Sequence, residues 1–179
     1  HAGLTVGEDG ASHQSVEDLT IMRVLPNMRV ICPCDGAQTR MAIRTAIDTH
    51  GPFYVRLGRP GVEAVYGDYG SDAPFELGKA NLLRDGTDVS LIATGLMVQE
   101  SLKAAEQLEA QGISVRVVDM HTLKPIDEQA IIDASHRTGA IVTVEEHSIL
   151  GGLGGAVAEV LSENAPCYLK RVGVLDMFG

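Results

Sequence analysis

The feature that most constrains the fold is an alternation of short apolar runs and longer amphipathic stretches in the second half of the chain. Runs rich in Val and Ile at 88–95, 114–120 and 140–146 have the length and composition of buried strands. Between them, 98–112 and 127–139 carry apolar residues at helical spacing and end in Gly. Strands that alternate with helices form mainly parallel sheets covered on both faces. The sequence therefore predicts a doubly wound α/β domain.

The same pattern continues to the end of the chain. The stretch 147–164 is expected to lead into a helix, and 169–175 is expected to form the last strand. The glycines from Gly151 to Gly155 superficially resemble a phosphate-binding loop, because they follow a strand and open a helix. They lack the Lys-Ser/Thr pair of a P-loop and the full spacing of a dinucleotide site. We interpret them as serving a tight turn and close helix packing.

The first half shows a similar alternation with fewer strands. A short helix is expected over 15–24, with the Ser15 hydroxyl as its N-terminal cap. Apolar runs at 28–33 and 53–58 predict strands, and 37–50 between them predicts a helix. These strands are too few to close a sheet alone. We therefore expect the end of an α/β domain whose start is missing.

Composition changes between the two halves. From 60 to 74 the chain is mainly Gly, Asp, Tyr and Ser with little periodicity, which is typical of a connection. A chain of 179 residues is long enough to bury a core as one domain or as two small ones. We predict a first domain at 1–68, a linker at 69–77 and a second domain at 78–179.

Charge and composition exclude several classes of function. The chain has 24 acidic and 14 basic residues, a net charge of -10, and no run of Lys or Arg that would neutralise successive phosphates, so we expect no nucleic-acid partner. No stretch approaches the roughly 20 consecutive apolar residues of a membrane span, so we expect no membrane association and a cytoplasmic location. Cys32, Cys34 and Cys167 match no zinc-site spacing and are expected to be reduced structural thiols.

The first thirteen residues, HAGLTVGEDGASH, combine acidic and imidazole side chains with glycines. Gly3, Gly7 and Gly10 allow tight turns and a close approach to a ligand. His13 can exchange a proton near neutral pH, and Asp9 can accept a hydrogen bond from a hydroxyl or orient an imidazole. On composition alone this stretch is either a working loop or a polar loop that caps the following helix.

Two arginines lie at the end of the predicted strand 53–58. Open α/β sheets present ligand-binding groups at the carboxyl ends of their strands. The guanidinium of Arg56 or Arg59 can bind a phosphate or carboxylate through two parallel hydrogen bonds. Either residue can instead form a surface ion pair.

The remaining cysteines and histidines carry weaker patterns. Cys32 and Cys34 have no base nearby in the sequence, so we expect neither to be a nucleophile. His121, His136 and His147 are single histidines in separate elements, and we expect them in loops or at the surface.

Four segments, in this order, resemble the C-terminal half of transketolases. HAGLTVGEDGASHQ resembles the H-x-G-x-x-x-G-E-D-G-x-x-H-Q segment of the family's pyrimidine-binding domain, and GPFYVRLGR is similar to the strand that ends that domain. DMHTLKPID and VEEHSILGGLGGAVAEVL resemble two segments of the family's C-terminal domain. The resemblance spans the whole chain and is greatest to split transketolases, whose halves are separate polypeptides.

The resemblance implies a transferase activity that depends on thiamine diphosphate and a divalent metal, Mg²⁺ or Ca²⁺. Transketolases move a two-carbon ketol unit from a ketose phosphate to an aldose phosphate in the pentose phosphate pathway, and the cofactor serves as the electron sink. The implied partners are the N-terminal half of the enzyme, in a homo-oligomer or a heterotetramer, and sugar phosphates.

The same resemblance implies roles for particular residues. His13 matches the family's histidine beside the cofactor and the reacting oxygens, which is both catalytic and cofactor-binding. Asp9 matches the carboxylate that accepts from the C2 hydroxyl of the substrate. His1 and Arg59 match the pair that binds the terminal phosphate. Arg56 has no such counterpart and is expected to form a surface ion pair.

Several parts of the family's site are absent from these residues. Neither the catalytic Glu and stacking aromatic residue of the pyrimidine-binding domain nor the diphosphate and metal motif can be located. The Ser-Gly and final helix that follow RVGVLDMFG in the family are also missing. We therefore expect a fragment, or the ordered part of a longer subunit, that contributes no metal ligand, binds no cofactor alone and is inactive alone.

Two other classes of function stay open at this point. The first is a fragment of a 1-deoxy-D-xylulose-5-phosphate synthase or of a 2-oxoacid dehydrogenase E1 β subunit. The spacing from His1 to Asp9 favours transketolase over the synthases, whose similar segment has one residue fewer. The second is a non-catalytic module that serves assembly or regulation.

Overall fold

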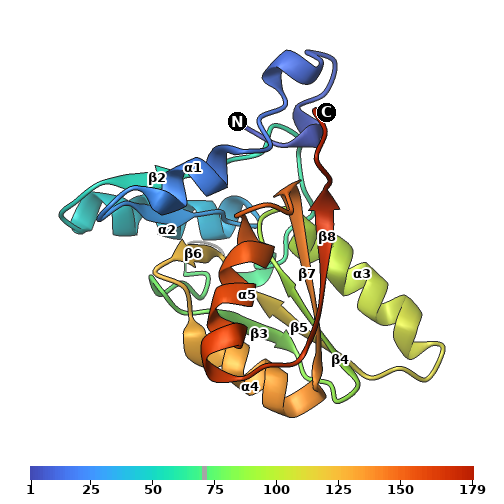
Figure 1. Ribbon diagram of the computed structural model, residues 1–179. Helices are drawn as coiled ribbons and strands as arrows, with labels where there is room; N and C mark the ends of the chain where they lie inside the picture. The colour runs from blue at the N-terminus through green and yellow to red at the C-terminus, as the bar shows by residue number, and fades with distance from the viewer. Residues whose placement is uncertain (70–71) are drawn as a thin grey trace.

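The computed structural model describes residues 1–69 and 72–179 as a mixed α/β structure built on two sheets (Figure 1). The strand order is β3-β5-β4-β7-β8 in the larger sheet and β2-β1-β6 in the smaller one. The strands of the larger sheet are β3 (Asn81–Arg84), β4 (Val89–Ala93), β5 (Val115–Asp119), β7 (Ala140–Ser148) and β8 (Tyr168–Val174), and those of the smaller sheet are β1 (Arg29–Ile31), β2 (Phe53–Val55) and β6 (Thr122–Lys124).

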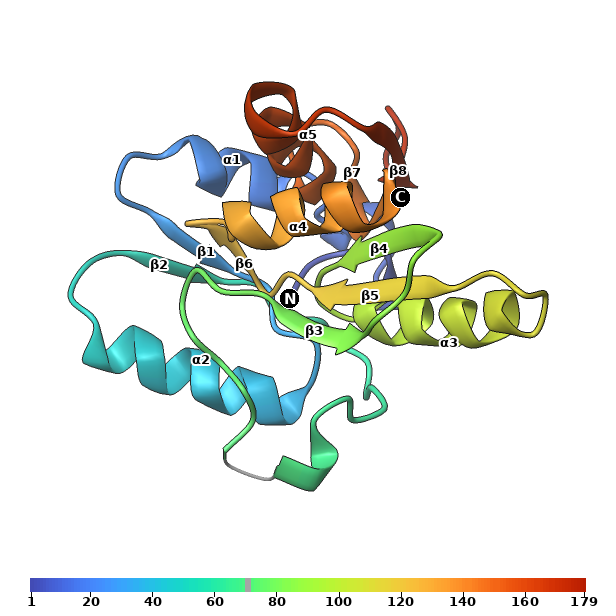
Figure 2. The same ribbon diagram turned by 90° about the horizontal axis from the view of Figure 1, so that it is seen from below.

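The larger sheet has helices on both faces. Helix α3 (Met97–Glu109) covers one face, and α4 (Glu128–Thr138) and α5 (Leu153–Asn164) cover the other (Figure 2). Strands β5, β4, β7 and β8 are parallel to their neighbours, and β3 is added antiparallel at the edge. The predicted doubly wound, mainly parallel sheet is therefore confirmed.

The ends of α4 show why the sequence forms a helix there. The Asp127 carboxylate accepts a hydrogen bond from the Ala130 N–H at 3.1 Å, which satisfies one of the unpaired donors of the first turn. Gly139 follows the last turn with φ at 67°, a left-handed conformation that glycine adopts without strain. The predicted helix end at this glycine is confirmed.

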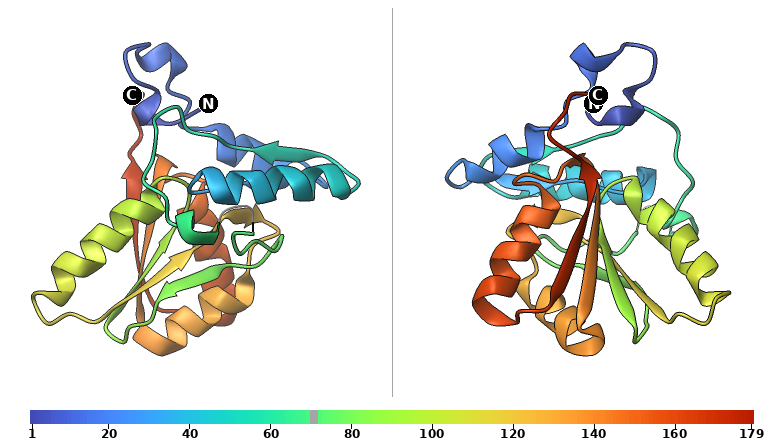
Figure 3. Two further views of the ribbon diagram at one scale, coloured as in Figure 1. Left: turned by 180° about the vertical axis from the view of Figure 1, so that it is seen from behind. Right: turned by 45° about the vertical axis from the view of Figure 1, so that its right-hand side comes forward.

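The smaller sheet takes two strands from the first half of the chain and one from the second. Strands β1 and β2 are parallel, and β6 pairs antiparallel with β1 through Val30 opposite Lys124 and Ile31 opposite Thr122. Helices α1 (Asp18–Val24) and α2 (Gly36–Asp48) lie on opposite sides of this sheet (Figure 3). Strand β6 was not predicted, because Leu123 stands between a threonine and a lysine and so forms no apolar run.

The predicted start of α1 is wrong. The helix begins at Asp18, and the residue before it, Glu17, makes no side-chain cap hydrogen bond. Ser15 instead accepts a hydrogen bond at its backbone oxygen from the Gly3 N–H, at 2.8 Å. Ser15 therefore closes the stretch before it, and the opening residues do not cap the helix.

The two halves share one hydrophobic core. Leu19 and Val30 from the first half pack in the same buried cluster as Ile92, Met120 and Ile131 from the second half. Because this cluster joins the two halves, burial of its apolar surface stabilises the packing of the two sheets against each other.

The connection predicted at 60–74 is mostly exposed in its described part and packs against this body at two residues. Residues 70–71 lie outside the described residues. On either side of them Tyr66 and Ala73 are buried, and a short 3-10 helix, η3, spans Gly67–Tyr69. In the part of the chain that the structure describes, no helix has the length and apolar character needed to cross a membrane.

Candidate active site

The first fifteen residues form a closed loop, which we call the opening loop (residues 1–15). It contains two short 3-10 helices, η1 (Leu4–Val6) and η2 (Ala11–His13). Its ends are held by backbone hydrogen bonds from Ala2 N–H to the Leu57 oxygen at 3.1 Å and from Gly3 N–H to the Ser15 oxygen at 2.8 Å. Glycines at the turns have positive φ, so the compact path depends on them. The loop projects from the body beside the C-terminal end of the chain (Figures 1 and 3).

Two of the predicted site residues meet where Arg59 contacts the opening loop. The Arg59 Nη1 atom forms an ion pair with the Asp9 carboxylate and also donates to the Val6 backbone oxygen at 2.8 Å. The side chains of Arg59 and Asp9 are 50% and 39% exposed. Among the described residues, the Nε and Nη2 atoms of Arg59 have no hydrogen-bond partner, so its outer edge faces solvent.

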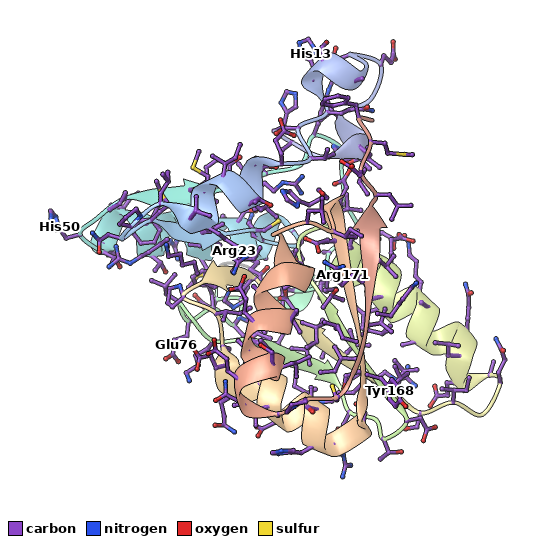
Figure 4. All side chains as sticks on the ribbon, in the orientation of Figure 1. His13, Arg23, His50, Glu76, Tyr168 and Arg171 are labelled. Atoms are coloured by element: carbon purple, nitrogen blue, oxygen red, sulfur yellow. The ribbon has the colours of Figure 1, made fainter. Side chains whose placement is uncertain are left out.

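The two predicted histidines are exposed on the same loop. His13 lies at its tip and points away from the body (Figure 4). Its Nδ1 atom is 3.0 Å from the Ser12 hydroxyl oxygen. Within the described residues, no hydrogen bond joins His13 or His1 to Asp9 or Arg59. The structure thus brings Asp9 and Arg59 together and leaves both imidazoles accessible.

The predicted surface ion pair of Arg56 is wrong, because its ion pair is buried. Arg56 is 6% exposed, and its Nε atom lies 3.1 Å from the Asp18 carboxylate. Its Nη2 atom donates to the Glu146 backbone oxygen at 2.8 Å, and Asp18 also accepts from the Tyr54 hydroxyl at 2.8 Å. Arg56 therefore ties α1 and β2 to the end of β7 in the interior.

Two of the three single histidines are buried. His147 lies within β7, which contradicts its predicted place in a loop or at the surface, whereas His121 lies in the connection between β5 and β6. His147 has no exposed surface, and burial lowers its pKa, although its Nδ1 atom contacts the Ser148 oxygen at 2.8 Å. His121 is also fully buried, stacks on the Phe75 ring with centroids 4.4 Å apart, and has its pKa lowered to about 4 by burial. His136 on α4 is exposed, as predicted.

A second buried polar cluster joins α2 to β5. The Asp119 carboxylate accepts from Gln38 Nε2 at 2.6 Å and from the Tyr66 hydroxyl at 2.8 Å. Asn81 Nδ2 donates to the same hydroxyl at 2.9 Å. Burial raises the pKa of Asp119 to about 6, although the hydrogen bonds from Gln38 and Tyr66 oppose the shift. No pattern in the sequence indicated this cluster, because its members are scattered polar residues.

The glycine-rich start of α5 holds a carboxylate of the chain itself. Glu145 accepts hydrogen bonds from the Leu153 N–H at 2.6 Å and the Gly154 N–H at 2.8 Å. Burial raises the Glu145 pKa to about 7, and the two backbone donors oppose this rise. A Cβ at Gly152 would overlap Glu145 and His147. The interpretation of these glycines as a turn and packing device is therefore confirmed, and the helix N-terminus has no room for a phosphate.

A cavity of about 430 Å³ lies at the carboxyl ends of β1, β2 and β4. Cys32, Cys34, Arg56 and Glu146 are among its lining residues, and none of the four predicted site residues lines it. Burial is the main cause that raises the pKa of Cys32 and of Cys34, so neither thiol is activated as a nucleophile. Within the described residues all three cysteines are free.

Comparison with known proteins identifies the family. The model of the transketolase C-terminal domain matches residues 78–179, and that of the transketolase pyrimidine binding domain matches residues 1–63. The chain belongs to the transketolase family. Its mixed α/β fold is that of the pyrimidine-binding and C-terminal domains of transketolases, as the sequence predicted.

Several relatives are subunits of transketolases. A 6-deoxy-6-sulfo-D-fructose transketolase subunit of Clostridium sp. is 49% identical over 99% of this chain and 54% of its own length. A subunit of the apulose-4-phosphate transketolase of Phocaeicola vulgatus is 45% identical over 97% of this chain and 55% of its own length. The chain therefore spans about half the length of these curated relatives.

A solved structure supports the same relationship. A split gene transketolase, described as an inactive β4 tetramer, matches with a TM-score of 0.90 and 52% identity. The match covers 98% of this chain and 56% of that one. The predicted resemblance to split transketolases is confirmed.

Proposed function

We propose that this chain is part of a thiamine diphosphate-dependent transketolase and supplies contacts to its sugar phosphate substrates. The observation that carries the proposal is the ion pair between Arg59 and Asp9 of the opening loop, which also bears His1 and His13. These four residues are the ones that match the family's substrate-binding segment.

In this proposal Arg59 and His1 bind the terminal phosphate of the substrate. The outer nitrogens of Arg59, Nε and Nη2, have no partner among the described residues and can form the two parallel hydrogen bonds that a phosphate accepts. The pairing with Asp9 holds the guanidinium in place for this contact. A phosphate bound here fixes one end of the substrate while the carbonyl end reacts.

Asp9 and His13 act nearer the reacting end in the same proposal. The second carboxylate oxygen of Asp9 would accept from the C2 hydroxyl, and a substrate without that hydroxyl would lose the contact. His13 would hold or move a proton at the reacting oxygens, since its imidazole is exposed and its neutral form both donates and accepts.

Thiamine diphosphate, with Mg²⁺ or Ca²⁺, would supply the electron sink for carbon–carbon bond cleavage. Among the described residues of this chain, His13 is the group that we assign to contact with this cofactor. No three His, Cys, Asp or Glu side chains in the described part are placed to hold a metal ion. His13 can contact the cofactor, and the diphosphate and its metal would be bound by residues outside this chain.

The proposed partner rests on relatives that are described as subunits of transketolases and on the incomplete site. We propose that the N-terminal half of a transketolase completes the site, in a homo-oligomer or a heterotetramer in the cytoplasm, and that this chain alone is inactive. The solved relative described as an inactive β4 tetramer supports this view. We also propose two domains, at 1–68 and 78–179 with a linker at 69–77; the family matches at 1–63 and 78–179 support them.

Reconstitution tests the proposed function. The full-length subunit is mixed with its N-terminal partner, thiamine diphosphate and Mg²⁺, and ketol transfer is measured from ketose phosphates to aldose phosphates. We expect transfer by the mixture and none by this subunit alone. Transfer from pyruvate with release of CO₂ would favour the synthase alternative, and no transfer from any donor would contradict a catalytic role.

A further inference from the structure

One carboxylate of the second half reaches into the opening loop. Glu146 lies near the end of β7 and is 8% exposed. Its Oε1 atom accepts a hydrogen bond from the Thr5 N–H, in η1. The carboxylate also lies against Gly3, where an added Cβ would overlap it and where φ is 93°. The loop and the carboxylate are therefore closely fitted to each other.

The backbone at the end of β7 is fixed by two hydrogen bonds, one at Glu146 and one at Ser148. Arg56 donates to the Glu146 backbone oxygen at 2.8 Å and is held by Asp18 at 3.1 Å. Two residues further on, the Ser148 N–H donates to the Val16 oxygen at 2.7 Å, just beyond the opening loop. The end of β7 therefore contacts both the start of the loop and the segment that leaves it.

Most other contacts of the loop come from the first half. The Leu57 backbone oxygen accepts a hydrogen bond from the Ala2 N–H. The Arg59 guanidinium donates to the Val6 backbone oxygen and pairs with the Asp9 carboxylate. A carboxylate hydrogen bond is roughly twice as strong as a neutral one, and it is stronger where water is excluded. Glu146 thus provides a strong, directional contact from the sheet of the C-terminal domain to the middle of η1.

We propose that Glu146 is a positioning residue for the transketolase site, which fixes η1 and, through it, the placement of Asp9 and His13. The inference rests on the proposed function and gives the C-terminal domain a defined role in it. Glu146 does not touch substrate or cofactor in this proposal. It acts through the Thr5 N–H and through the space that Gly3 leaves.

The test measures amide hydrogen exchange by mass spectrometry in the subunit assembled with its N-terminal partner. Glu146→Ala should speed exchange at Thr5 by about 10-fold to 100-fold, because a charge-assisted hydrogen bond is lost. Glu146→Gln keeps an acceptor oxygen and should keep most of the protection. Gly3→Ala should speed exchange at the same amide from the other side of the contact, since its Cβ displaces the carboxylate.

A neighbouring carboxylate provides the matched control. Glu145 lies on the same strand, is also buried, and contacts Leu153 and Gly154 at the start of α5. Glu145→Gln leaves one acceptor oxygen for these two donors, so it should speed exchange at one of the two amides and leave Thr5 unchanged. Unchanged exchange at Thr5 in both Glu146→Ala and Gly3→Ala would overturn the proposal.

Kinetics of the same assembled variants separate positioning from mere stability. Glu146→Ala should lower kcat by about 10-fold to 100-fold, as expected for reacting groups displaced by about 1 Å, with a smaller change in KM, and Glu146→Gln should restore most of it. Faster exchange with unchanged kcat would overturn the positioning role. If neither the assembled wild type nor the variant transfers a ketol unit, the proposed function fails and this role with it, while faster exchange in the variant would still establish the loop anchor.

Discussion

Two Asp–Arg ion pairs join the N-terminal segment to the residues that follow β2. Asp9 and Arg59 form a pair in which both side chains are more than a third exposed, whereas Asp18 and Arg56 are each less than a tenth exposed. An exposed pair exchanges partners at little cost, but a buried pair leaves an uncompensated charge when it is broken. The exposed pair is therefore suited to ligand exchange. The buried pair is suited to a structural role, since it fixes Arg56, which also donates to the Glu146 backbone oxygen of the second half.

The largest expected effect comes from breaking the buried pair. Arg56→Ala should lower the free energy of unfolding by about 3–5 kcal/mol, because Asp18 would remain buried without its partner. Urea unfolding of the purified chain, followed by circular dichroism, measures this loss. A loss below about 1 kcal/mol would show that the Tyr54 hydroxyl alone satisfies Asp18 and would remove the contrast between the pairs.

The next effect is a loss of activity with almost no change in the free energy of unfolding. His13→Ala should lower kcat of the reconstituted enzyme by about 10²-fold to 10⁴-fold, which is the usual contribution of a general acid–base group. Since the side chain is exposed at the loop tip, the free energy of unfolding should change by less than about 0.5 kcal/mol. His136→Ala, another exposed histidine, is the control and should leave both quantities unchanged. Full activity of His13→Ala would remove His13 from the site.

The polar cluster at Asp119 predicts a pH dependence. Burial raises its pKa to about 6 in the folded chain, from 3.8 as the ordinary value, so between these pH values the folded state holds a proton that the unfolded state has lost. The free energy of unfolding should therefore fall as pH rises from about 4 to about 6, by on the order of 2 kcal/mol from this group.

Asp119→Asn removes that titration and should flatten this part of the pH profile. The measurement is the difference in free energy of unfolding between wild type and variant at several pH values, which cancels groups common to both. Glu145, whose raised pKa gives a slope of the same sign up to about pH 7, is present in both proteins. A difference that does not vary with pH would show that Asp119 titrates normally.

The smallest effect is expected at the exposed pair. Arg59→Ala should change the free energy of unfolding by less than about 1 kcal/mol, since solvent screens the pair. In the reconstituted enzyme the same variant should raise KM for phosphorylated substrates by about tenfold or more, because a guanidinium–phosphate contact is lost. A stability loss equal to that of Arg56→Ala would contradict the assignment of the two pairs to different tasks.

The elements that could be predicted from the sequence are the long, periodic ones. The strands near 89–93, 115–119 and 140–146 and the helices between them repeat apolar residues over enough length to show a period. Strands β1 and β2 are short but lie in apolar runs, whereas β3 and β6 mix apolar with polar residues, so only the first two were predicted. The Ser15 cap was wrong because α1 begins at Asp18, which puts Glu17 and not Ser15 at the cap position.

The candidate site divides in the same way. The opening loop has a dense local pattern of glycines and titratable residues, and the pair of Asp9 with Arg59 brings together two residues that the pattern singled out. The buried Asp18–Arg56 pair has no such pattern. Its two residues and the neighbouring His147 come together only through the tertiary fold. A single histidine in a sequence also does not reveal its burial, and the extension of β7 to Ser148 is what encloses His147.

The pairing of β6 with β1 limits how such proteins recombine. A chimera that takes residues 1–77 from one relative and the remainder from another would build a three-stranded sheet from two parents, with the register Val30–Lys124 formed across the junction. Crossovers should succeed only between parents whose edge strands are compatible, even where the connection itself tolerates a cut. The two halves therefore have to be compatible with each other, although the segment that links them is the least regular part of the sequence.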